Sequence, residues 1–262
     1  MADRARAMAH ELPPRPAGLE TEEAATVAGA LAAIAAAEFI VVFVNVPVGA
    51  AFHALLVFGL IVQWIVREPT ALRRCLAALS LVPLLRIVSM ALVLPDLESI
   101  DWGTFAAALV LLSALLMARA LGMNQTELRL WLPVQARPLL VLSGAAFLVA
   151  LPASPWLDRF PATGGAAAFL VLAAVAEEVT FRGVIQGTLR TLFGRSAIFY
   201  STVPFVVVYF ATRSLAMVLL AAVLGIVAGW AVERFRSVWM AIGIHAAFSL
   251  GAGIFWPNLL GI

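Results

Sequence analysis

The sequence predicts an all-α polytopic membrane protein, a bundle of about nine transmembrane helices with eight as the alternative count. Hydrophobic residues make up 63% of the chain and charged residues only 12%, and the mean hydropathy is +1.03. Soluble domains are far less apolar. Apolar runs of about 20 residues, the length of a helix that crosses a bilayer, also recur along the chain. Strands are not expected, because backbone polar groups in lipid must be satisfied within each helix.

Turn-forming residues divide the apolar sequence into successive spans. Asn45 to Pro47, the Glu68-Pro69 pair and the Gly194-Arg195 corner are typical of such breaks. The spans expected are 22–44, 47–66, 72–94, 103–121, 138–156, 165–190, 196–211, 214–232 and 237–259.

The arginines predict a cytoplasmic N terminus. Fourteen of the 17 arginines fall in the tail and in connections on the same side as that terminus, and basic residues collect on the cytoplasmic side. Only Arg159 and Arg213 lie in connections on the other side, and Arg86 lies within a span, where we expect it to pair or to reach the interface. The net charge of +2 does not indicate a nucleic-acid partner, and Cys75 is the single cysteine.

Three regions follow along the chain. Residues 1–21 form a polar cytoplasmic tail, residues 22–160 form N-terminal transmembrane helices with a cytoplasmic loop at 121–138, and residues 161–262 form a transmembrane core. In the loop, Asn124 to Glu127 has the pattern of a capping box before the apolar stretch Leu128 to Leu132. This pattern favours a helix lying on the membrane surface, with a substrate gate as the alternative.

Three charged side chains interrupt the core near its start. Glu177, Glu178 and Arg182 lie within six positions of an apolar span, where each ionised group costs roughly 2.5 to 3.5 kcal/mol on insertion scales. Glu178 and Arg182 are four apart and can pair on one helix face. Glu177 is then left without a partner and is suited to accept a proton from water as a general base. The alternative is a structural ion-pair cluster.

Two later spans carry polar residues at helical spacing. Phe205 and Tyr209 are four apart, as are His245 and Ser249. Helix length places Glu177, Tyr209 and His245 at a similar depth, so we expect them to line one cavity. The alternative for Tyr209 is a packed tyrosine with a satisfied hydroxyl.

Two remaining features of these spans are expected to be structural. Gly225 and Gly229 form a GxxxG pattern, which permits close helix packing. His53 has no polar neighbour at helical spacing and is expected to be a packing histidine.

Taken in order, these motifs resemble the CAAX-prenyl-protease and bacteriocin-processing family of glutamic intramembrane endopeptidases. The matching candidates are Glu177, Glu178, Arg182, Tyr209, His245 and Ser249. The first motif of the family, EExxxR, is complete here. The second, FxxxH, ends in Tyr209, and the third, a histidine followed four residues later by asparagine, ends in Ser249.

The resemblance implies an endopeptidase of the bacterial plasma (inner) membrane that cuts a membrane-associated protein or peptide. By this resemblance Glu177 activates water, Glu178 and Arg182 support it, Tyr209 takes the place of an assisting histidine, and His245 with Ser249 stabilises the oxyanion. No cofactor and no metal ion are expected, and the partners are the substrate and the lipid bilayer, without nucleic acid.

The phenol of Tyr209 is the serious departure from the family pattern, because it cannot replace imidazole as a base at neutral pH. A catalytically silent member that binds or chaperones membrane proteins is therefore the second hypothesis. A proton or ion pathway through the buried acids is the third.

Overall fold

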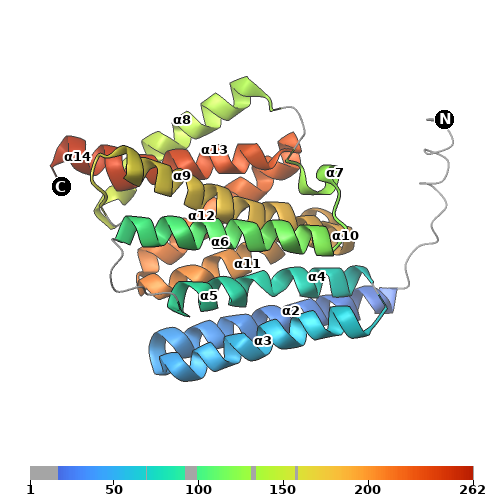
Figure 1. Ribbon diagram of the computed structural model, residues 1–262. Coiled ribbons are helices and arrows are strands. Elements are labelled where there is room, and N and C mark those ends of the chain that lie inside the picture. The colour runs from blue at the N-terminus through green and yellow to red at the C-terminus, as the bar shows by residue number, and fades with distance from the viewer. Residues whose placement is uncertain (1–16, 69, 92–98, 131–133, 157–158, 262) are drawn as a thin grey trace, which may run out of the picture.

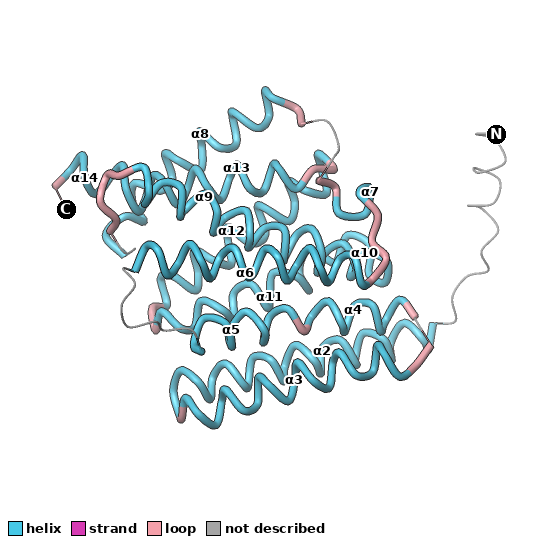
Figure 2. Tube along the Cα trace, viewed as in Figure 1, coloured by secondary structure: helices cyan, strands magenta, loops and turns pink. Residues whose placement is uncertain are grey.

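The computed structural model describes residues 17–68, 70–91, 99–130, 134–156 and 159–261. Within these residues every regular element is a helix and no strand occurs (Figure 2). The all-α prediction is therefore confirmed for the described part of the chain.

The elements follow one another with few residues between them. In chain order they are α2 (Ala17–Phe39), η1 (Ile40–Val44), α3 (Val46–Val66), α4 (Ala71–Leu79), α5 (Leu81–Ala91), α6 (Ser99–Ala120), α7 (Gln125–Leu128), α8 (Ala136–Ala153), η2 (Ser154–Trp156), α9 (Gly164–Glu178), η3 (Val179–Ile185), α10 (Gln186–Phe193), η4 (Gly194–Ser196), α11 (Ala197–Val208), η5 (Tyr209–Thr212), α12 (Leu215–Phe235), α13 (Val238–Leu250), η6 (Gly251–Phe255) and α14 (Trp256–Leu260).

Capping residues and left-handed residues set the helix boundaries. Asn45 ends η1 and caps α3, its side chain accepting from the Val48 N–H at 3.0 Å. Gly194, with φ of +56°, makes the corner between α10 and α11 that the sequence predicts. Arg213 and Arg236 also adopt left-handed backbone conformations at the ends of η5 and α12.

The long helices lie side by side in one bundle (Figure 1). Helices α2 and α3 form one edge and α8 the other, while α6, α9 and α12 lie between them. Helix α9 packs against α6 and α13, and α13 also packs against α8 and α12. The segment with the charged motif is therefore near the middle of the bundle.

Six helices of the described residues are long and apolar enough to cross a membrane, which corrects the expected count of nine uniform spans. They are Thr21–Val44, Val46–Val66, Asp101–Ala120, Ala136–Ala153, Leu215–Phe235 and Val238–Leu260.

The other three expected spans are helical but less regular. A turn at Ser80 separates α4 from α5. Three ionisable side chains interrupt the segment formed by α9, η3 and α10, and α11 is only 12 residues long. These differences concern span regularity, because within the described residues the nine expected ranges are helical except at the Ser80 turn and at three range ends, Leu121, Ser214 and Ser237.

Two other expectations about polar segments need correction. Helix α2 begins at Ala17, so the end of the predicted tail is helical, while residues 1–16 lie outside the described residues. The capping box at Asn124 and Glu127 is confirmed, but α7 ends at Leu128 because Arg129 adopts a left-handed conformation. The predicted helix over Leu128 to Leu132 thus includes Leu128 but is wrong at Arg129 and Leu130, and its last two residues lie outside the described part.

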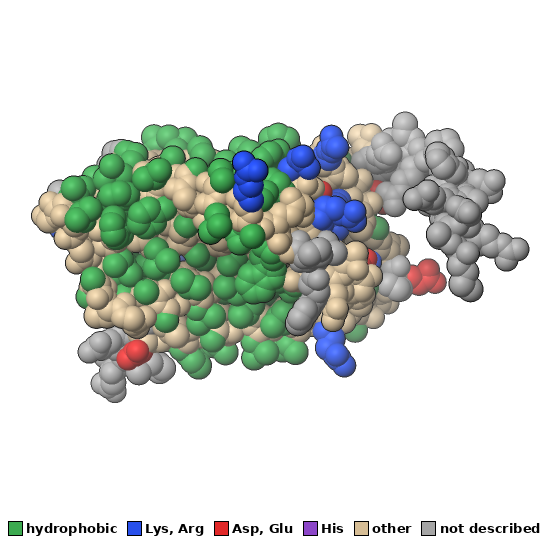
Figure 3. All heavy atoms as spheres, turned by 90° about the horizontal axis from the view of Figure 1, so that it is seen from above, with side chains coloured by type: hydrophobic (Ala, Val, Ile, Leu, Met, Phe, Trp, Pro, Cys, Tyr) green, Lys and Arg blue, Asp and Glu red, His purple; other side chains and the backbone are tan. Residues whose placement is uncertain are grey.

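The outer surface has the character of an integral membrane protein. Large apolar side chains such as Leu55, Phe58, Leu140 and Leu215 are exposed on the described helices. Most of the arginines visible in Figure 3 gather toward one end of the molecule, beyond the apolar surface. This separation agrees with a bundle whose apolar belt faces lipid and whose arginine-rich end faces water.

Candidate active site

The charged motif lies where α9 changes into a π-helix. Helix α9 ends at Glu178, and η3 follows from Val179 to Ile185 with all seven residues buried. The N–H of Gln186 bonds to the carbonyl of Phe181, five residues earlier, as in a π-helical turn. Such turns insert an extra residue into a helix and are common at functional sites.

Glu178 forms the centre of a buried ionic group. One of its oxygens lies 2.8 Å from Nδ1 of His245 on α13, and the other lies 3.4 Å from Nε of Arg182. The side chains of Glu178 and Arg182 are fully buried, and that of His245 is nearly so. The predicted pair of Glu178 and Arg182 is therefore present, and His245 joins it from another helix.

Arg182 is held on several sides. Its Nη1 donates to the Ser201 hydroxyl at 2.9 Å, and its guanidinium carbon lies 5.2 Å from the centre of the Phe205 ring. A Cβ atom on Gly225 would lie 3.2 Å from Nη2 of Arg182. Gly225 of the GxxxG pattern therefore makes room for this side chain, beyond the helix contact that the sequence predicts.

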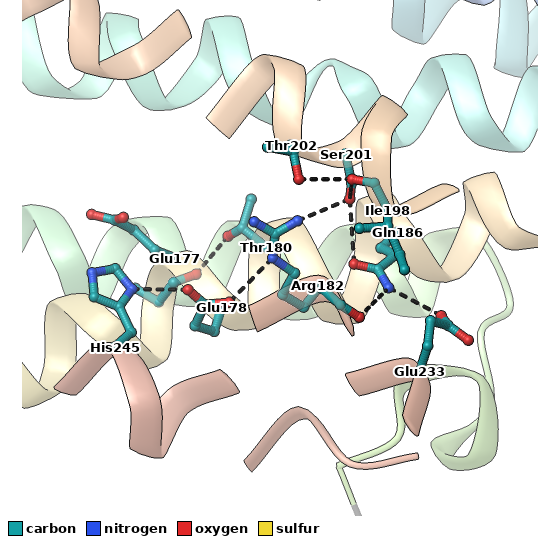
Figure 4. Close-up of polar contacts among 12 residues, drawn as sticks. Glu177, Glu178, Thr180, Arg182, Gln186, Ile198, Ser201, Thr202, Glu233 and His245 are labelled. Atoms are coloured by element: carbon teal, nitrogen blue, oxygen red, sulfur yellow. Dashed lines mark hydrogen bonds and ion pairs between the residues drawn. The ribbon is translucent and has the colours of Figure 1, made fainter. Parts of the chain in front are cut away.

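Glu177 faces away from this ionic group and is only partly buried. The hydroxyl of Tyr209 donates to Oε2 of Glu177 at 3.4 Å. In Figure 4 the Glu177 carboxylate and the ring nitrogen of His245 that does not contact Glu178 point to the same side. The structure thus brings Tyr209 and His245 close to Glu177, but of these three residues only Glu177 lines the adjacent cavity.

A cavity of about 280 Å³ reaches Glu177. Its walls come from α5, α6 and α9, and its lining is largely apolar, with the rings of Trp102 and Phe169 among the contacts. A Cβ atom added to Gly103 would lie 2.6 Å from the Phe169 ring, so this glycine leaves space where α6 meets α9. Two of the three walls therefore come from helices that the sequence motifs do not include.

A polar chain extends from Arg182 toward the arginine-rich end of the molecule (Figure 4). The Ser201 hydroxyl donates to Oε1 of Gln186 at 3.3 Å. The Gln186 amide donates to the Gly229 carbonyl at 3.2 Å and to Oε1 of Glu233 at 3.0 Å. Gln186 is fully buried, and sequence reasoning did not identify it, although it lies four residues after Arg182 on the same segment.

The chain ends at the loop that follows α7. Arg129 donates to the Val232 carbonyl at 2.7 Å and to Oε2 of Glu233 at 3.1 Å. Burial lowers the pKa of the Arg129 guanidinium, and the nearby Arg190 lowers it further, while Glu233 opposes both. These contacts attach the loop to the bundle, so Arg129 does not lie on the membrane surface as an exposed residue.

Ser249 is the candidate residue that is not hydrogen-bonded to the other candidates. It lies one turn after His245 on α13, and it makes no hydrogen bond to the other five candidates. Within the described ranges, no group of three or more His, Cys, Asp or Glu side chains is arranged to hold a metal ion. The two carboxylate oxygens of Glu178 already contact Arg182 and His245, so this group of side chains does not fit a metal centre.

A second buried ionic group lies outside this site. Arg86 on α5 donates from Nε to Oε2 of Glu38 at 2.7 Å and also contacts the other oxygen, while Nε2 of His53 lies 3.3 Å from Glu38. All three side chains are at most 12% exposed. Arg86 thus pairs within the bundle, and the polar partner of His53 comes from α2, which spacing within its own helix could not predict.

Comparison with known proteins gives one finding. Residues 159–251 match a family model described as type II CAAX prenyl endopeptidase Rce1-like. The search of curated proteins and the search of solved structures gave no match. The matched range begins just before α9 and ends at the start of η6, so it contains all six candidate residues.

Proposed function

Because residues 159–251 belong to the CAAX-type family of intramembrane endopeptidases, we propose that this integral membrane protein hydrolyses a peptide bond with water activated by Glu177. One observation carries the proposal. Glu177 borders the cavity, whereas the adjacent Glu178 is buried and neutralised by Arg182 and His245. Two neighbouring carboxylates in different environments are suited to different roles.

The chemistry begins with a water molecule between Glu177 and the substrate carbonyl. The water oxygen forms a bond to the carbonyl carbon while its proton passes to the Glu177 carboxylate. Tyr209 donates to Oε2 of Glu177 and thereby orients that carboxylate. Glu177 then gives the proton to the amide nitrogen as the carbon–nitrogen bond breaks, so the products are a carboxyl group and an amine.

His245 is the candidate for stabilising the oxyanion. Its Nδ1 faces a carboxylate and therefore donates, which leaves the second ring nitrogen on the side of the Glu177 carboxylate. With a proton on both nitrogens of His245, the charges of Glu177, Glu178, Arg182 and His245 sum to zero. The free N–H can then donate to the developing negative charge, and Ser249, one turn away, is the second candidate donor.

The cavity indicates how a substrate approaches. Its apolar lining favours a chain that enters from the bilayer, and the matching family model is described as a CAAX prenyl endopeptidase. We therefore expect a membrane-associated protein or peptide, cut in the plasma membrane of a bacterium.

The test uses the full chain in lipid nanodiscs with two quenched fluorescent peptides ending in a CAAX sequence, one farnesylated and one not. Cleavage is followed by fluorescence and the products are identified by mass spectrometry. Glu177→Gln should lower the rate by about 10²- to 10⁴-fold, because it removes the general base. Glu68→Gln, which changes an exposed glutamate in the connection after α3, is the control and should cleave at the wild-type rate.

Each outcome bears on the proposal. Loss of cleavage in Glu177→Gln, with a retained unfolding transition, supports it. Cleavage at the wild-type rate in that variant refutes it. Equal rates for the two peptides would show that the prenyl group is not required, without affecting the role of Glu177.

A second function is favoured by Tyr209, which stands where the family has histidine. A silent family member would bind membrane proteins through the same cavity and cleave none of them. In that case Tyr209→His together with Ser249→Asn should create cleavage of the farnesylated peptide that the wild-type protein lacks. Measurable cleavage by the wild-type protein excludes this alternative.

A further inference from the structure

A groove of about 340 Å³ lies between α11 and α12, on the opposite side of α11 from α2. It is lined by Arg195, Ile198, Trp230, Glu233 and Arg234. Arg195 and Arg234 are exposed, and neither forms an ion pair with a described residue. The groove is separate from the cavity at Glu177 and has no part in the proposed hydrolysis.

The charge of the groove favours an anion. Glu233 is its only acidic residue, and this carboxylate is offset by Arg129 at 3.1 Å and by Arg190 at 3.6 Å. Because Glu233 is already satisfied, it does not neutralise Arg195 or Arg234. Two guanidinium groups therefore remain available to a ligand, and guanidinium groups bind phosphate oxygens with two parallel hydrogen bonds.

The surface beside the groove favours a ligand with apolar chains. On α12, Arg234, Trp230, Val227 and Val223 are spaced by four, three and four residues, so they share one face. Trp230, Val227 and Val223 are 46%, 37% and 62% exposed. This face thus changes from a cation, through an aromatic ring, to an exposed apolar stripe within three turns.

The α11 side of the groove supplies the second cation. Arg195 lies in η4, two residues before the start of α11, and Ile198 of α11 lines the groove beside it. Tryptophan side chains are enriched at the level of lipid headgroups, with their rings between water and hydrocarbon. The basic groove therefore lies at one end of the apolar stripe of α12, with Trp230 between the two.

We propose that the groove binds an anionic glycerophospholipid, with Arg195 and Arg234 contacting the headgroup phosphate and the acyl chains lying along the exposed stripe of α12. Trp230 lies at the junction of the two parts, where its ring packs against Phe235 at 6.0 Å, and the Arg234 guanidinium lies over the same Phe235 ring. These contacts hold the groove side of α12 in place for the headgroup. Basic pockets between transmembrane helices on the cytoplasmic side are typical sites for such lipids.

The experiment measures bound lipid by native mass spectrometry, after release of the full chain from nanodiscs containing equal phosphatidylcholine and phosphatidylglycerol. The wild-type protein should retain phosphatidylglycerol in preference to phosphatidylcholine. Arg195→Gln/Arg234→Gln should weaken this retention by about 30-fold, since each arginine near the surface contributes about one kcal/mol.

A matched control distinguishes lipid binding in the groove from attraction of the lipid to the net charge of the protein. Arg67→Gln/Arg119→Gln removes two exposed arginines that are expected on the same side but lie outside the groove, so the net charge changes equally. Retention should be unchanged in this control. An equal loss in both double variants would overturn the proposal, because the lipid would then follow net charge alone.

A competition arm distinguishes the lipid from free phosphate. Inorganic phosphate added to the nanodiscs should leave the bound phosphatidylglycerol in place, because it lacks chains to contact the apolar stripe of α12. Displacement by inorganic phosphate at the same headgroup concentration would show a phosphate site and refute the lipid. Neither result depends on whether Glu177 is catalytic.

Discussion

Replacing Arg182 by methionine should destabilise the fold far more than the same change at an exposed arginine of the described chain. The substitution keeps an unbranched side chain of similar length but removes the guanidinium. Oε2 of Glu178 then loses its ionic partner, and the Ser201 hydroxyl loses its charged donor. The side chains of both Glu178 and Arg182 are fully buried, so water cannot replace what is lost.

The expected magnitude follows from the burial of the pair. Removing one partner of a buried ion pair costs about 3 to 5 kcal/mol, mainly because the other charge remains without compensation. Removing both charges should cost less, because no ion is then stranded. We expect Arg182→Met to lower the free energy of unfolding by about 3 to 5 kcal/mol, and Arg182→Met/Glu178→Gln to recover about 2 kcal/mol of that loss.

The assay is reversible unfolding in mixed micelles, followed by circular dichroism as the denaturing detergent fraction rises. Glu178→Gln alone completes the double-mutant cycle, and Arg67→Met, an exposed arginine at the end of α3, is the control, with an expected change within about 0.5 kcal/mol. A double variant whose loss equals the sum of the two single losses would refute the pairing. So would an Arg182→Met variant as stable as the control.

Three further changes test other parts of the site. Tyr209→Phe removes the hydroxyl that donates to Glu177, and it should slow cleavage of the farnesylated peptide by up to about tenfold. An unchanged rate would show that this hydrogen bond does not orient Glu177. Gln186→Leu leaves the Gly229 carbonyl without its amide donor, so the free energy of unfolding, measured by thermal unfolding, should fall by about 1 to 3 kcal/mol. Wild-type stability in this variant would argue against the polar chain. Gly103→Val places a side chain against the Phe169 ring and narrows the cavity. KM for the farnesylated peptide should therefore rise, and KM for a smaller unprenylated peptide should change less. Equal changes in KM for both peptides would contradict the role of the cavity.

The sequence was sufficient for the helical class and for the charged residues of the EExxxR motif. Hydropathy and turn residues located the helical ranges, because a chain in lipid must form helices of about bilayer length. The cost of charge in lipid identified Glu177, Glu178 and Arg182, and spacing by four predicted the Glu178 and Arg182 pair. The family comparison at residues 159–251 agrees with the motifs that suggested the resemblance.

Interactions between helices depended on the tertiary structure. Spacing along one helix says nothing of which side chain on another helix lies opposite. His245 therefore had no predicted bond to Glu178, and His53 and Arg86 had no predicted partner in Glu38. The π-helical turn of η3 also changes the face that Arg182 presents, and the regular helical period used for prediction does not include such a turn.

The sequence by itself determined that this chain is a helical membrane protein with an EExxxR motif, because lipid penalises every exposed backbone group and every unpaired charge. The tertiary structure alone showed that His245 joins the predicted pair of Glu178 and Arg182. It also showed that α5 and α6, outside the motifs, form most of the cavity wall around Glu177. The physical reason is that the burial of a side chain and its access to a cavity depend on how distant helices pack. The spacing of residues along one helix does not specify that packing.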